Sequence, residues 1–331
     1  MMPRNPWYDP EKTHHTKHGF RNSPGSPSRP PISAELAREA AHFAGELMRL
    51  AGDNPFPSDH VLSETRALDE YHAIGNQDKI LWLGHASFLI QLGGITFLTD
   101  PYLTDYASPV PSRSTKRLIP SAISIERLPK VDCILVSHNH YDHLDTRSLV
   151  LLATRFYDAQ VIVPLGLKTI LNKQGFRHVQ ELDWYDRADR SGYSIAALPA
   201  IHMSRRGLFD LNKTLWCGFA IECNNQRIYF AGDTAYGEVF KEIANRFDGF
   251  DLGLVPIGAY QPRSLMASVH TTPEEAVLIG EDLGAKKLIA MHWGTIRLTT
   301  EPMLEPKERF LAANSRVPRH VMKIGETLAL C

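Results

Sequence analysis

The sequence predicts an α/β fold, arranged as a four-layer α/β/β/α sandwich of two mixed β-sheets. Short β-branched and apolar segments predict strands, and the first of these strands are joined as hairpins. Further along the chain, strands alternate with amphipathic segments of helical period, which is typical of mixed sheets covered by helices. The chain has 331 residues, 43% of them hydrophobic, which is enough to build a substantial core.

The strands begin with a meander that is joined at Gly93 and Gly94, a hairpin signal. Strands are predicted over residues 80–83, 87–91, 95–99, 131–136, 161–163, 193–198, 215–222, 227–231, 252–256 and 287–291, and residues 321–323 are expected to close a sheet. Helices are predicted over residues 146–155, 165–173, 239–246, 273–283 and 305–313. Residues 79–331 are therefore expected to form one domain, since nothing in them marks an inserted second unit.

The N-terminal part divides into two segments. Residues 1–31 are rich in Pro, His, Ser and Arg, which predicts an extended arm. Its histidines, His14, His15 and His18, suggest either a metal site or an exposed tail. We favour the exposed tail because no carboxylate lies in register with them.

Residues 32–78 are expected to form a helical extension packed on the body. Ser33 caps a helix that runs to about Leu50, and apolar residues recur along one face at helical spacing. The other face carries charges of both signs, so packing is favoured over an interfacial helix that meets lipid.

The composition restricts the function classes. A formal net charge of -1 gives no global field to attract nucleic acid. No apolar run approaches the roughly 20 residues that span a bilayer, and the first residues lack the apolar core of a signal peptide. We expect the four cysteines, Cys133, Cys217, Cys223 and Cys331, to be reduced thiols. The prediction is a cytoplasmic protein, with peripheral contact with a membrane surface and homo-oligomerisation left open.

The most informative segment is Ser137-His-Asn-His-Tyr-Asp-His-Leu144, which follows the apolar run over residues 131–136. Three imidazoles and a carboxylate fall within six positions where a strand passes into a loop; they are His138, His140, Asp142 and His143. Imidazole and carboxylate are the donors that catalytic zinc prefers. Four donors are more than one tetrahedral ion with an open position can use, so the spacing suggests two metal ions.

Three further donors each follow a predicted strand: His202, Asp233 and His292. Gly232 lets the backbone come close at Asp233, whose carboxylate has two oxygens and can bridge two cations. Each residue alone would more often be a turn former or a hydrogen-bonded core residue. Together with the loop cluster, they favour metal ligation.

Several short sequence motifs resemble those of the N-acylphosphatidylethanolamine-hydrolysing phospholipase D branch of the metallo-β-lactamase superfamily. They occur in order between about Lys79 and Thr300. Besides the loop cluster, they are Trp82-Leu-Gly-His-Ala-Ser87, Phe97-Leu-Thr-Asp-Pro101, Phe230-Ala-Gly-Asp-Thr234, Ile257-Gly-Ala-Tyr260, His270 with Pro273-Glu-Glu-Ala-Val277, and Met291-His-Trp-Gly-Thr295. The sequence departs from the branch at Ser264 and Leu265, where aromatic residues are expected, and in the region before Lys79.

The resemblance implies two zinc ions, with manganese or iron as alternatives. One ion would be held by His138, His140 and His202. The other would be held by Asp142, His143 and His292. Asp233 would bridge both ions together with a water-derived hydroxide.

Other residues receive candidate roles near the ions. Asp142, the proton donor His270 and Tyr141 form the catalytic set, although Tyr141 could also merely pack under the loop. Arg263 and His85 are the substrate-binding candidates, with a solvated loop arginine as the alternative for Arg263.

Two residues are expected to support the ligands. Asp100 would accept the second N–H of a ligand imidazole, although a capped strand end would explain it almost as well. Thr234 would hold Asp233 through its hydroxyl.

The resulting prediction is a dinuclear zinc hydrolase, a phosphodiesterase of the phospholipase D type that acts on N-acylphosphatidylethanolamine-like lipids. The first alternative is a dizinc hydrolase of a small soluble ester, lactone or sugar phosphate. The second is a non-enzymatic scaffold, which the complete donor set opposes. Nucleic acid is not an expected partner.

Overall fold

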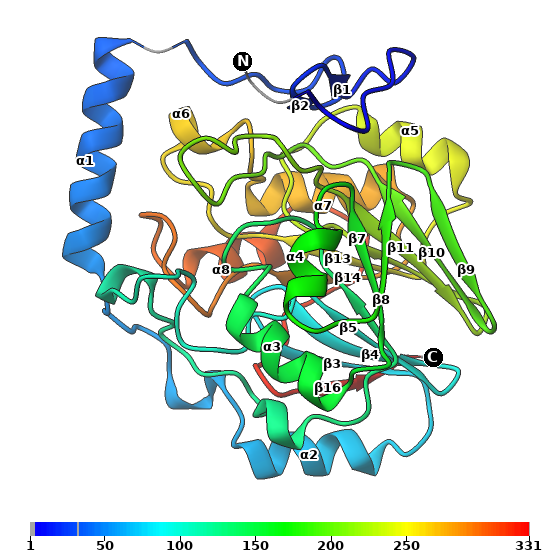
Figure 1. Cartoon of the computed structure of the whole chain (residues 1–331). Coiled ribbons are helices and arrows are strands. Elements are labelled where there is room, and N and C mark those ends of the chain that lie inside the picture. The colour runs from blue at the N-terminus through cyan, green and yellow to red at the C-terminus, as the bar shows by residue number, and fades with distance from the viewer. Residues whose placement is uncertain (1–3, 32, 331) are drawn as a thin grey trace.

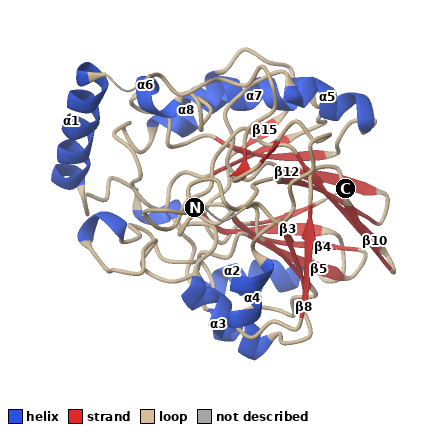
Figure 2. Ribbon diagram, turned by 45° about the horizontal axis from the view of Figure 1, so that its top comes forward, coloured by secondary structure: helices blue, strands red, loops and turns tan. Residues whose placement is uncertain are grey.

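A computed structural model describes residues 4–31 and 33–330 of the chain. Two seven-stranded mixed sheets lie face to face and bury the main hydrophobic core between them. Figure 2 shows α5, α7 and α8 on one side of the strands and α2, α3 and α4 on the other. This arrangement confirms the predicted four-layer sandwich.

The first sheet contains most of the N-terminal strands (Figure 1). Its order is β16 (Thr327–Ala329), β3 (Lys79–Gly84), β4 (Ser87–Leu92), β5 (Ile95–Thr99), β6 (Cys133–Leu135), β7 (Gln160–Pro164) and β8 (His178–Leu182). Neighbours pair antiparallel as far as β5 and parallel from there to β8. Its helices are α2 (Glu64–Ala73), α3 (Thr146–Arg155) and α4 (Lys168–Lys173).

The second sheet repeats this scheme of antiparallel pairs followed by parallel pairs. Its order is β9 (Arg187–Arg190), β10 (Tyr193–Leu198), β11 (Gly218–Cys223), β12 (Gln226–Phe230), β13 (Leu252–Pro256), β14 (Leu288–Met291) and β15 (Arg319–His320). Its helices are α5 (Val239–Arg246), α6 (Arg263–Met266), α7 (Pro273–Asp282) and α8 (Glu305–Ala312). Three short 3₁₀ turns cover Ser58–His60, Arg113–Thr115 and Ile125–Arg127.

Most predicted strands and helices are found within two or three residues of their expected bounds. The prediction that residues 321–323 close a sheet is wrong, because β15 and β16 flank that segment and each extends a different sheet. The polar edge strands β8 and β9 and the helix α2 were not predicted. Edge strands bury less apolar surface, so the pattern of their sequence is weaker.

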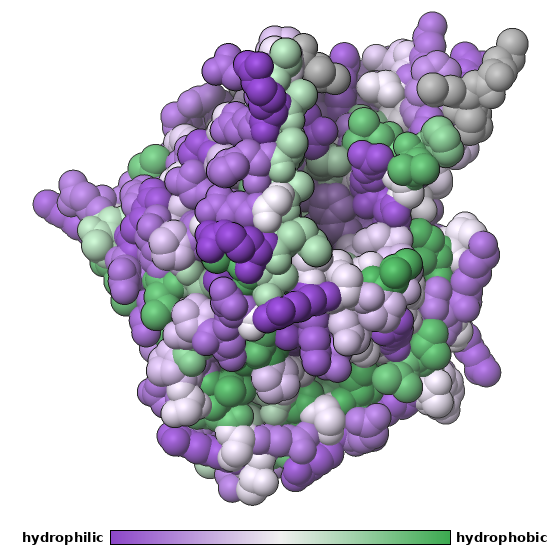
Figure 3. Space-filling view, turned by 90° about the vertical axis from the view of Figure 1, so that its left-hand side faces the viewer, coloured by the Kyte–Doolittle hydropathy of each residue, from purple (hydrophilic) through white to green (hydrophobic). Residues whose placement is uncertain are grey.

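The predicted helix α1 (Ala34–Leu50) forms, and the Ser33 hydroxyl caps it by accepting a hydrogen bond from the Leu36 N–H at 3.0 Å. None of its residues is fully buried, so any packing of this helix on the body is loose. Figure 1 places α1 at the edge of the molecule, and Figure 3 shows that the surface beside it is hollowed. Its apolar stripe, including Phe43 and Leu47, is only half-buried. A hydrogen bond from Ser264 to Glu39 links the helix to the body.

The arm is anchored to the body, which corrects the expectation of an exposed tail at His14 and His15. The short strands β1 (His15–Thr16) and β2 (Gly19–Phe20) pair as a hairpin, and both histidines are buried. Nε2 of His14 lies 2.7 Å from one oxygen of Asp183, and Nε2 of His15 lies 3.0 Å from the other. Lys12 donates to the same carboxylate. The missing carboxylate partner was therefore present, but about 170 residues away in sequence.

Replacing Asp183 with Asn should lower the free energy of unfolding by about 2–3 kcal/mol at neutral pH, because it removes a buried acceptor shared by three donors. Burial alone would raise the pKa of Asp183, but hydrogen bonds from His14 and Lys12 hold that pKa well below its usual value. The stabilisation is thus present above the ordinary carboxyl pKa of about 4 and is lost as the pH falls below it. Urea unfolding at several pH values should show the wild-type advantage shrinking below about pH 4. Asp189→Asn, at an exposed position of β9, is the control; an equal loss in both variants would contradict the expectation.

No helix in the described part of the chain is long and apolar enough to cross a membrane. Cys133, Cys217 and Cys223 are buried free thiols. The fourth cysteine, Cys331, lies outside the described residues.

Candidate metal centre

The predicted donors converge at one edge of the two sheets, where their strands end. The loop after β6 supplies two imidazoles, while the segments after β10 and β12 supply one donor each. Their ligand atoms all lie within 4.8 Å of one another; the four residues are His138, His140, His202 and Asp233. This group contains the three predicted ligands of the first ion and the predicted bridge.

A second group lies beside the first. It contains Asp142, His143 and His292, as predicted, and also His85, again with all ligand atoms within 4.8 Å of one another. The Nε2 atom of His85 lies 2.9 Å from an oxygen of Asp142. Sequence reasoning placed His85 only along the lining of the site. The available signal was its position directly after β3, the same context as that of the other donors.

Asp233 lies between the two groups. Its carboxylate oxygens are 3.2 Å from Nε2 of His143 and 3.1 Å from Nε2 of His292, both in the second group. Nε2 of His202, in the first group, is 3.7 Å away. The turn that carries Asp233 depends on Gly232, whose φ of +58° is in the left-handed region that favours glycine.

The donors fit metal ions better than they fit each other. Nε2 of His143, Nε2 of His292 and Oδ1 of Asp233 are all buried without a hydrogen-bond partner among the described residues. Buried polar atoms are rarely left unpaired unless a ligand satisfies them. Neutral imidazole nitrogens and carboxylate oxygens are the donor chemistry of catalytic divalent metal sites.

The electrostatics of the groups also favour cations. Burial would raise the pKa of Asp233, but the imidazoles of His143 and His292 hold that pKa well below its usual value. Conversely, despite burial, the carboxylates of Asp233 and Asp142 raise the pKa of His143. The ionised carboxylates thus attract positive charge to this pocket, and metal binding there would displace protons.

Asp100 supports the centre as predicted. Its side chain accepts hydrogen bonds from Nδ1 of His143 at 2.6 Å and from the backbone N–H and hydroxyl of Ser137, both at 2.6 Å. The Ser137 hydroxyl also lies 2.9 Å from Nδ1 of His138. One buried carboxylate therefore orients a histidine of each group, which leaves the Nε2 atom of each ring toward the centre.

Asp100→Asn should lower the affinity for metal by about 10- to 100-fold, because an amide cannot accept all three hydrogen bonds and no longer fixes the His143 ring. Competition with a chromogenic chelator measures the affinity. Asp132→Asn is the matched control, since Asp132 lies at the start of a neighbouring strand and its side chain bonds the Thr96 N–H. Unchanged affinity in the Asp100 variant would show that His143 is oriented by other contacts.

The N-terminal arm also contacts the centre, which the sequence did not indicate. The side-chain oxygen of Asn22 accepts hydrogen bonds from the backbone N–H of His202 and from the Trp216 indole, each at 3.0 Å. Nδ1 of His202 donates to the Val269 carbonyl at 2.8 Å. Asn22 thereby fixes the backbone of His202, and Val269 orients its imidazole.

Two predicted site residues make contacts that the sequence did not indicate. Thr234 was expected to hold Asp233, but its hydroxyl donates to the Ala235 carbonyl and accepts from the Ile201 N–H. It therefore ties together the two loops that carry Asp233 and His202. Arg263 was expected to contact a phosphate, but its guanidinium pairs with Glu275 at 2.9 Å and donates to the carbonyl of His270. Its charge is neutralised, so it positions the segment of His270.

The two remaining candidates lie at the edge of the centre. Tyr141 follows the packing alternative, since its ring lies 3.8 Å under the Arg206 guanidinium and its hydroxyl donates to the Arg206 carbonyl. His270 lies with its ring centroid 5.2 Å from that of His202 and 5.3 Å from that of His292. Its Nδ1 is buried and has no hydrogen-bond partner in residues 4–31 and 33–330. His270 is thus the predicted catalytic residue whose placement suits contact with a reacting group.

Comparison with known proteins agrees with this geometry. A model described as a beta-lactamase superfamily domain matches residues 96–293. N-acyl-phosphatidylethanolamine-hydrolyzing phospholipase D 1 of Caenorhabditis elegans is 36% identical over 301 residues, which cover 88% of this chain and 83% of the relative. The protein with the same activity in its name, described as mitochondrial, from Saccharomyces cerevisiae is 39% identical and covers 69% of this chain but only 50% of the yeast protein.

Solved structures show the same fold. Isothiocyanate hydrolase from Delia radicum gut bacteria superposes with a TM-score of 0.62 at 22% identity, covering 76% of this chain and 98% of that one. A possible metal-dependent hydrolase from Veillonella parvula gives a TM-score of 0.63 at 19% identity, covering 77% and 100%.

The fold and the paired donor groups define a metal-dependent hydrolase that binds a divalent metal. The donors lie at the ends of strands from both sheets, where the sequence motifs predicted them. The chain belongs to the metallo-β-lactamase superfamily, in the branch of the N-acylphosphatidylethanolamine-hydrolysing phospholipases D.

Proposed function

We propose that the chain is a dinuclear zinc phosphodiesterase of the phospholipase D type, acting on N-acylphosphatidylethanolamine-like lipids. The observation that carries this proposal is the pair of four-donor groups joined at Asp233. The names of the Caenorhabditis elegans and Saccharomyces cerevisiae relatives support the substrate class.

The residues would hold two ions as the sequence suggested. His138, His140 and His202 would hold one ion, and Asp233 would serve both. The other ion would be held by Asp142, His143 and His292, with His85 within reach of the same position. Imidazole and carboxylate donors suit zinc, and manganese or iron could also occupy such a site. When bound, such ions lower the pKa of a water molecule and neutralise negative charge on a phosphoryl group.

The protein's own groups would handle the proton and the leaving alkoxide. Burial lowers the pKa of His270 to about 4, so its imidazole is neutral at pH 7 and carries a single N–H. From its place beside His202 and His292, this N–H would donate a hydrogen bond to the leaving oxygen of a phosphodiester, and the proton that the alkoxide takes up would come from the attacking water. Arg263 contributes indirectly, because it holds the His270 carbonyl and pairs with Glu275 in the capping box of α7.

The test combines element analysis with two assays. We expect about two equivalents of zinc in protein purified with metal, turnover of bis-p-nitrophenyl phosphate, and release of N-acylethanolamine from N-acylphosphatidylethanolamine. Removal of metal by a chelator should abolish both activities, and added zinc should restore them. Intact phospholipid beside rapid turnover of a lactone or a sugar phosphate ester would instead support the alternative of a small soluble substrate. Cytoplasmic location, contact with a membrane surface and homo-oligomerisation remain predictions for fractionation, vesicle binding and sizing.

A further inference from the structure

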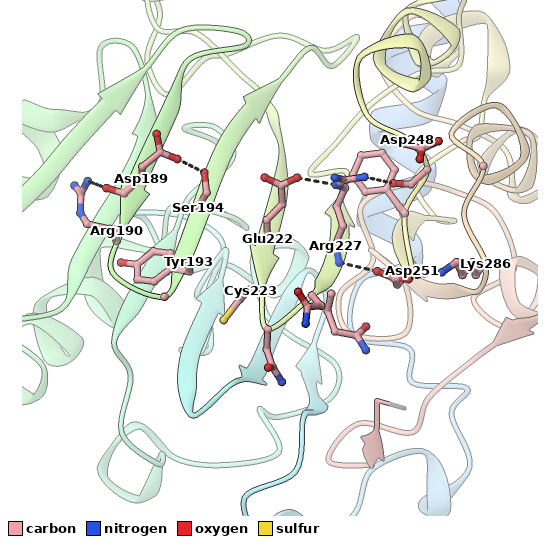
Figure 4. Close-up of a pocket in the computed structure, with 17 residues that line it drawn as sticks. Asp189, Arg190, Tyr193, Ser194, Glu222, Cys223, Arg227, Asp248, Asp251 and Lys286 are labelled. Atoms are coloured by element: carbon pink, nitrogen blue, oxygen red, sulfur yellow. Dashed lines mark hydrogen bonds and ion pairs between the residues drawn. The ribbon is translucent and has the colours of Figure 1, made fainter.

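The large polar cavity in Figure 4 does not carry a binding site. It has a volume of about 690 Å³ and lies along β10, β11 and β12. Its charges satisfy one another: Glu222 pairs with Arg227 at 2.7 Å, and Asp251 pairs with Lys286 at 2.7 Å. The lining carries four carboxylates and three cations, so it has no excess of positive charge to bind a phosphate.

A different cavity lies where the N-terminal arm crosses the metal centre. It has a volume of about 320 Å³ and is enclosed by residues 21–29 of the arm, the segment after β10 and residues 268–269. One wall contains His202 and Val269, the pair whose hydrogen bond orients a proposed metal ligand. The lining carries two arginines and several serines but no carboxylate; its residues are Arg21, Asn22, Ser23, Ser26, Pro27, Ser28, Arg29, His202, Met203, Leu211, Asn212, Ser268 and Val269.

The positive charge at this cavity is not neutralised by the protein. Among the described residues, no carboxylate forms an ion pair with Arg29 or with its neighbour Arg205. Burial and the charge of Arg205 lower the pKa of Arg29. The Arg29 guanidinium contacts the sulfur of Met203, directly after His202. Two close, unpaired cations repel each other, so an anion placed between them would be bound favourably.

Arg206, the next residue along the loop, shows the contrast. Its guanidinium lies over the Tyr141 ring and donates to the carbonyls of Asn139 and Leu144, at 2.8 Å each. Arg206 therefore has a structural role in holding the ligand loop. Arg205 donates through Nε to the Gly207 carbonyl at 2.8 Å, and Arg29 contacts Met203, so both are held more loosely than Arg206.

An apolar cavity adjoins the cationic one and shares Leu211 and Asn212 with it. It has a volume of about 940 Å³, and its lining includes Trp7, Phe20 and Phe209. Phe209 is 91% exposed, and a ligand that buried this ring would gain roughly 2 kcal/mol of binding free energy. In space, the metal centre is followed by the cationic cavity and then by the apolar cavity. This order matches that of the groups in an amphiphile with a charged phosphoryl head.

We propose that the N-terminal arm completes the substrate site: Arg29, with Arg205, binds the anionic phosphoryl oxygens of a phosphodiester lipid, and the adjoining apolar cavity binds its hydrocarbon chain. This proposal rests on the proposed phosphodiesterase function and deepens it, since it assigns the selection of a lipid over a short diester to residues 4–29 and the loop after His202. Arg29 takes the place of Arg263, whose charge is already paired.

The experiment compares a lipid and a short diester in matched variants. Arg29→Ala should raise KM about tenfold for both N-acylphosphatidylethanolamine and bis-p-nitrophenyl phosphate, with kcat within about twofold, and Arg29→Lys should restore part of the loss. Phe209→Ser should raise KM for the lipid and leave that for the short diester unchanged. Arg66→Ala, at a surface arginine of α2 paired with Glu70, is the control. An unchanged KM in Arg29→Ala, or an equal effect of Phe209→Ser on both substrates, would overturn the proposal.

A binding measurement separates this proposal from the proposed function. Titration of dihexanoyl phosphatidic acid into metal-loaded protein by calorimetry reports on the cavity without turnover. Weaker binding by Arg29→Ala than by the wild type would support the subsite even if the wild type hydrolyses neither substrate. Equal binding by both proteins would reject the subsite even if the wild type hydrolyses the lipid.

Discussion

Replacing Asp233 with Asn should reduce kcat on bis-p-nitrophenyl phosphate by roughly 10³-fold, a loss comparable with removal of a principal electrostatic group from an active site. Asp233 belongs to the first donor group and also contacts the second, with oxygens 3.7 Å from His202 and 3.2 Å from His143. The amide keeps the size of the side chain but removes its negative charge and one of its two acceptor oxygens. Neither ion would then be held as tightly.

Element analysis of the same variant should show fewer than two equivalents of metal. Asp251→Asn is a suitable control, because Asp251 pairs with Lys286 in the cavity of Figure 4 and touches no site residue. Full metal content with full activity in Asp233→Asn would mean that the two groups act independently of this carboxylate. Full metal content with lost activity would instead assign Asp233 to the reaction rather than to binding.

The second large effect is expected from Gly232→Ala, which should lower the free energy of unfolding by about 3 kcal/mol or more. A Cβ atom at this position would lie 2.7 Å from Cβ of Ser137 and 3.0 Å from the Cys217 carbonyl, and φ is +58°. Backbone strain and steric overlap therefore act together. The movement needed to relieve them would displace Asp233 from the donor groups, so metal affinity should fall as well.

Gly94→Ala separates these two causes. Gly94 also has a positive φ, +80°, but a Cβ there would meet nothing within 4 Å. It should cost only about 1 kcal/mol, the strain of a left-handed backbone. Urea unfolding of metal-free protein compares the two variants, and equal losses would show that the contacts with Ser137 and Cys217 are relieved without cost.

Much of the fold and of the centre could be predicted from local patterns. Each strand end, each helix cap and the group of four donors in residues 138–143 depends on only a few neighbouring residues. Such features can be recognised in a single sequence. Asp233 and His292 were identified because each follows a strong apolar strand. The fold class followed from the order of hairpins and alternating helices.

What could not be predicted depends on pairings between distant segments. The Asp183 partner of His14 lies 169 residues away, and the Asn22 contact with His202 spans 180 residues. The ion pair of Arg263 could not be predicted because its partner Glu275 comes from the next helix, α7. The exposure of α1 could not be predicted for a similar reason: an apolar stripe predicts that a helix has a contact face but not how closely another surface approaches it.

The centre draws its donors from both sheets, with His85 and residues 138–143 from the first and His202, Asp233 and His292 from the second. Bound metal would therefore link the two sheets, and metal binding would raise the free energy of unfolding by mass action. Loss of metal would then affect the stability of the protein as well as its activity. It would weaken the contact between the two sheets and expose the polypeptide to proteases. The cellular level of the protein would therefore depend on the supply of metal.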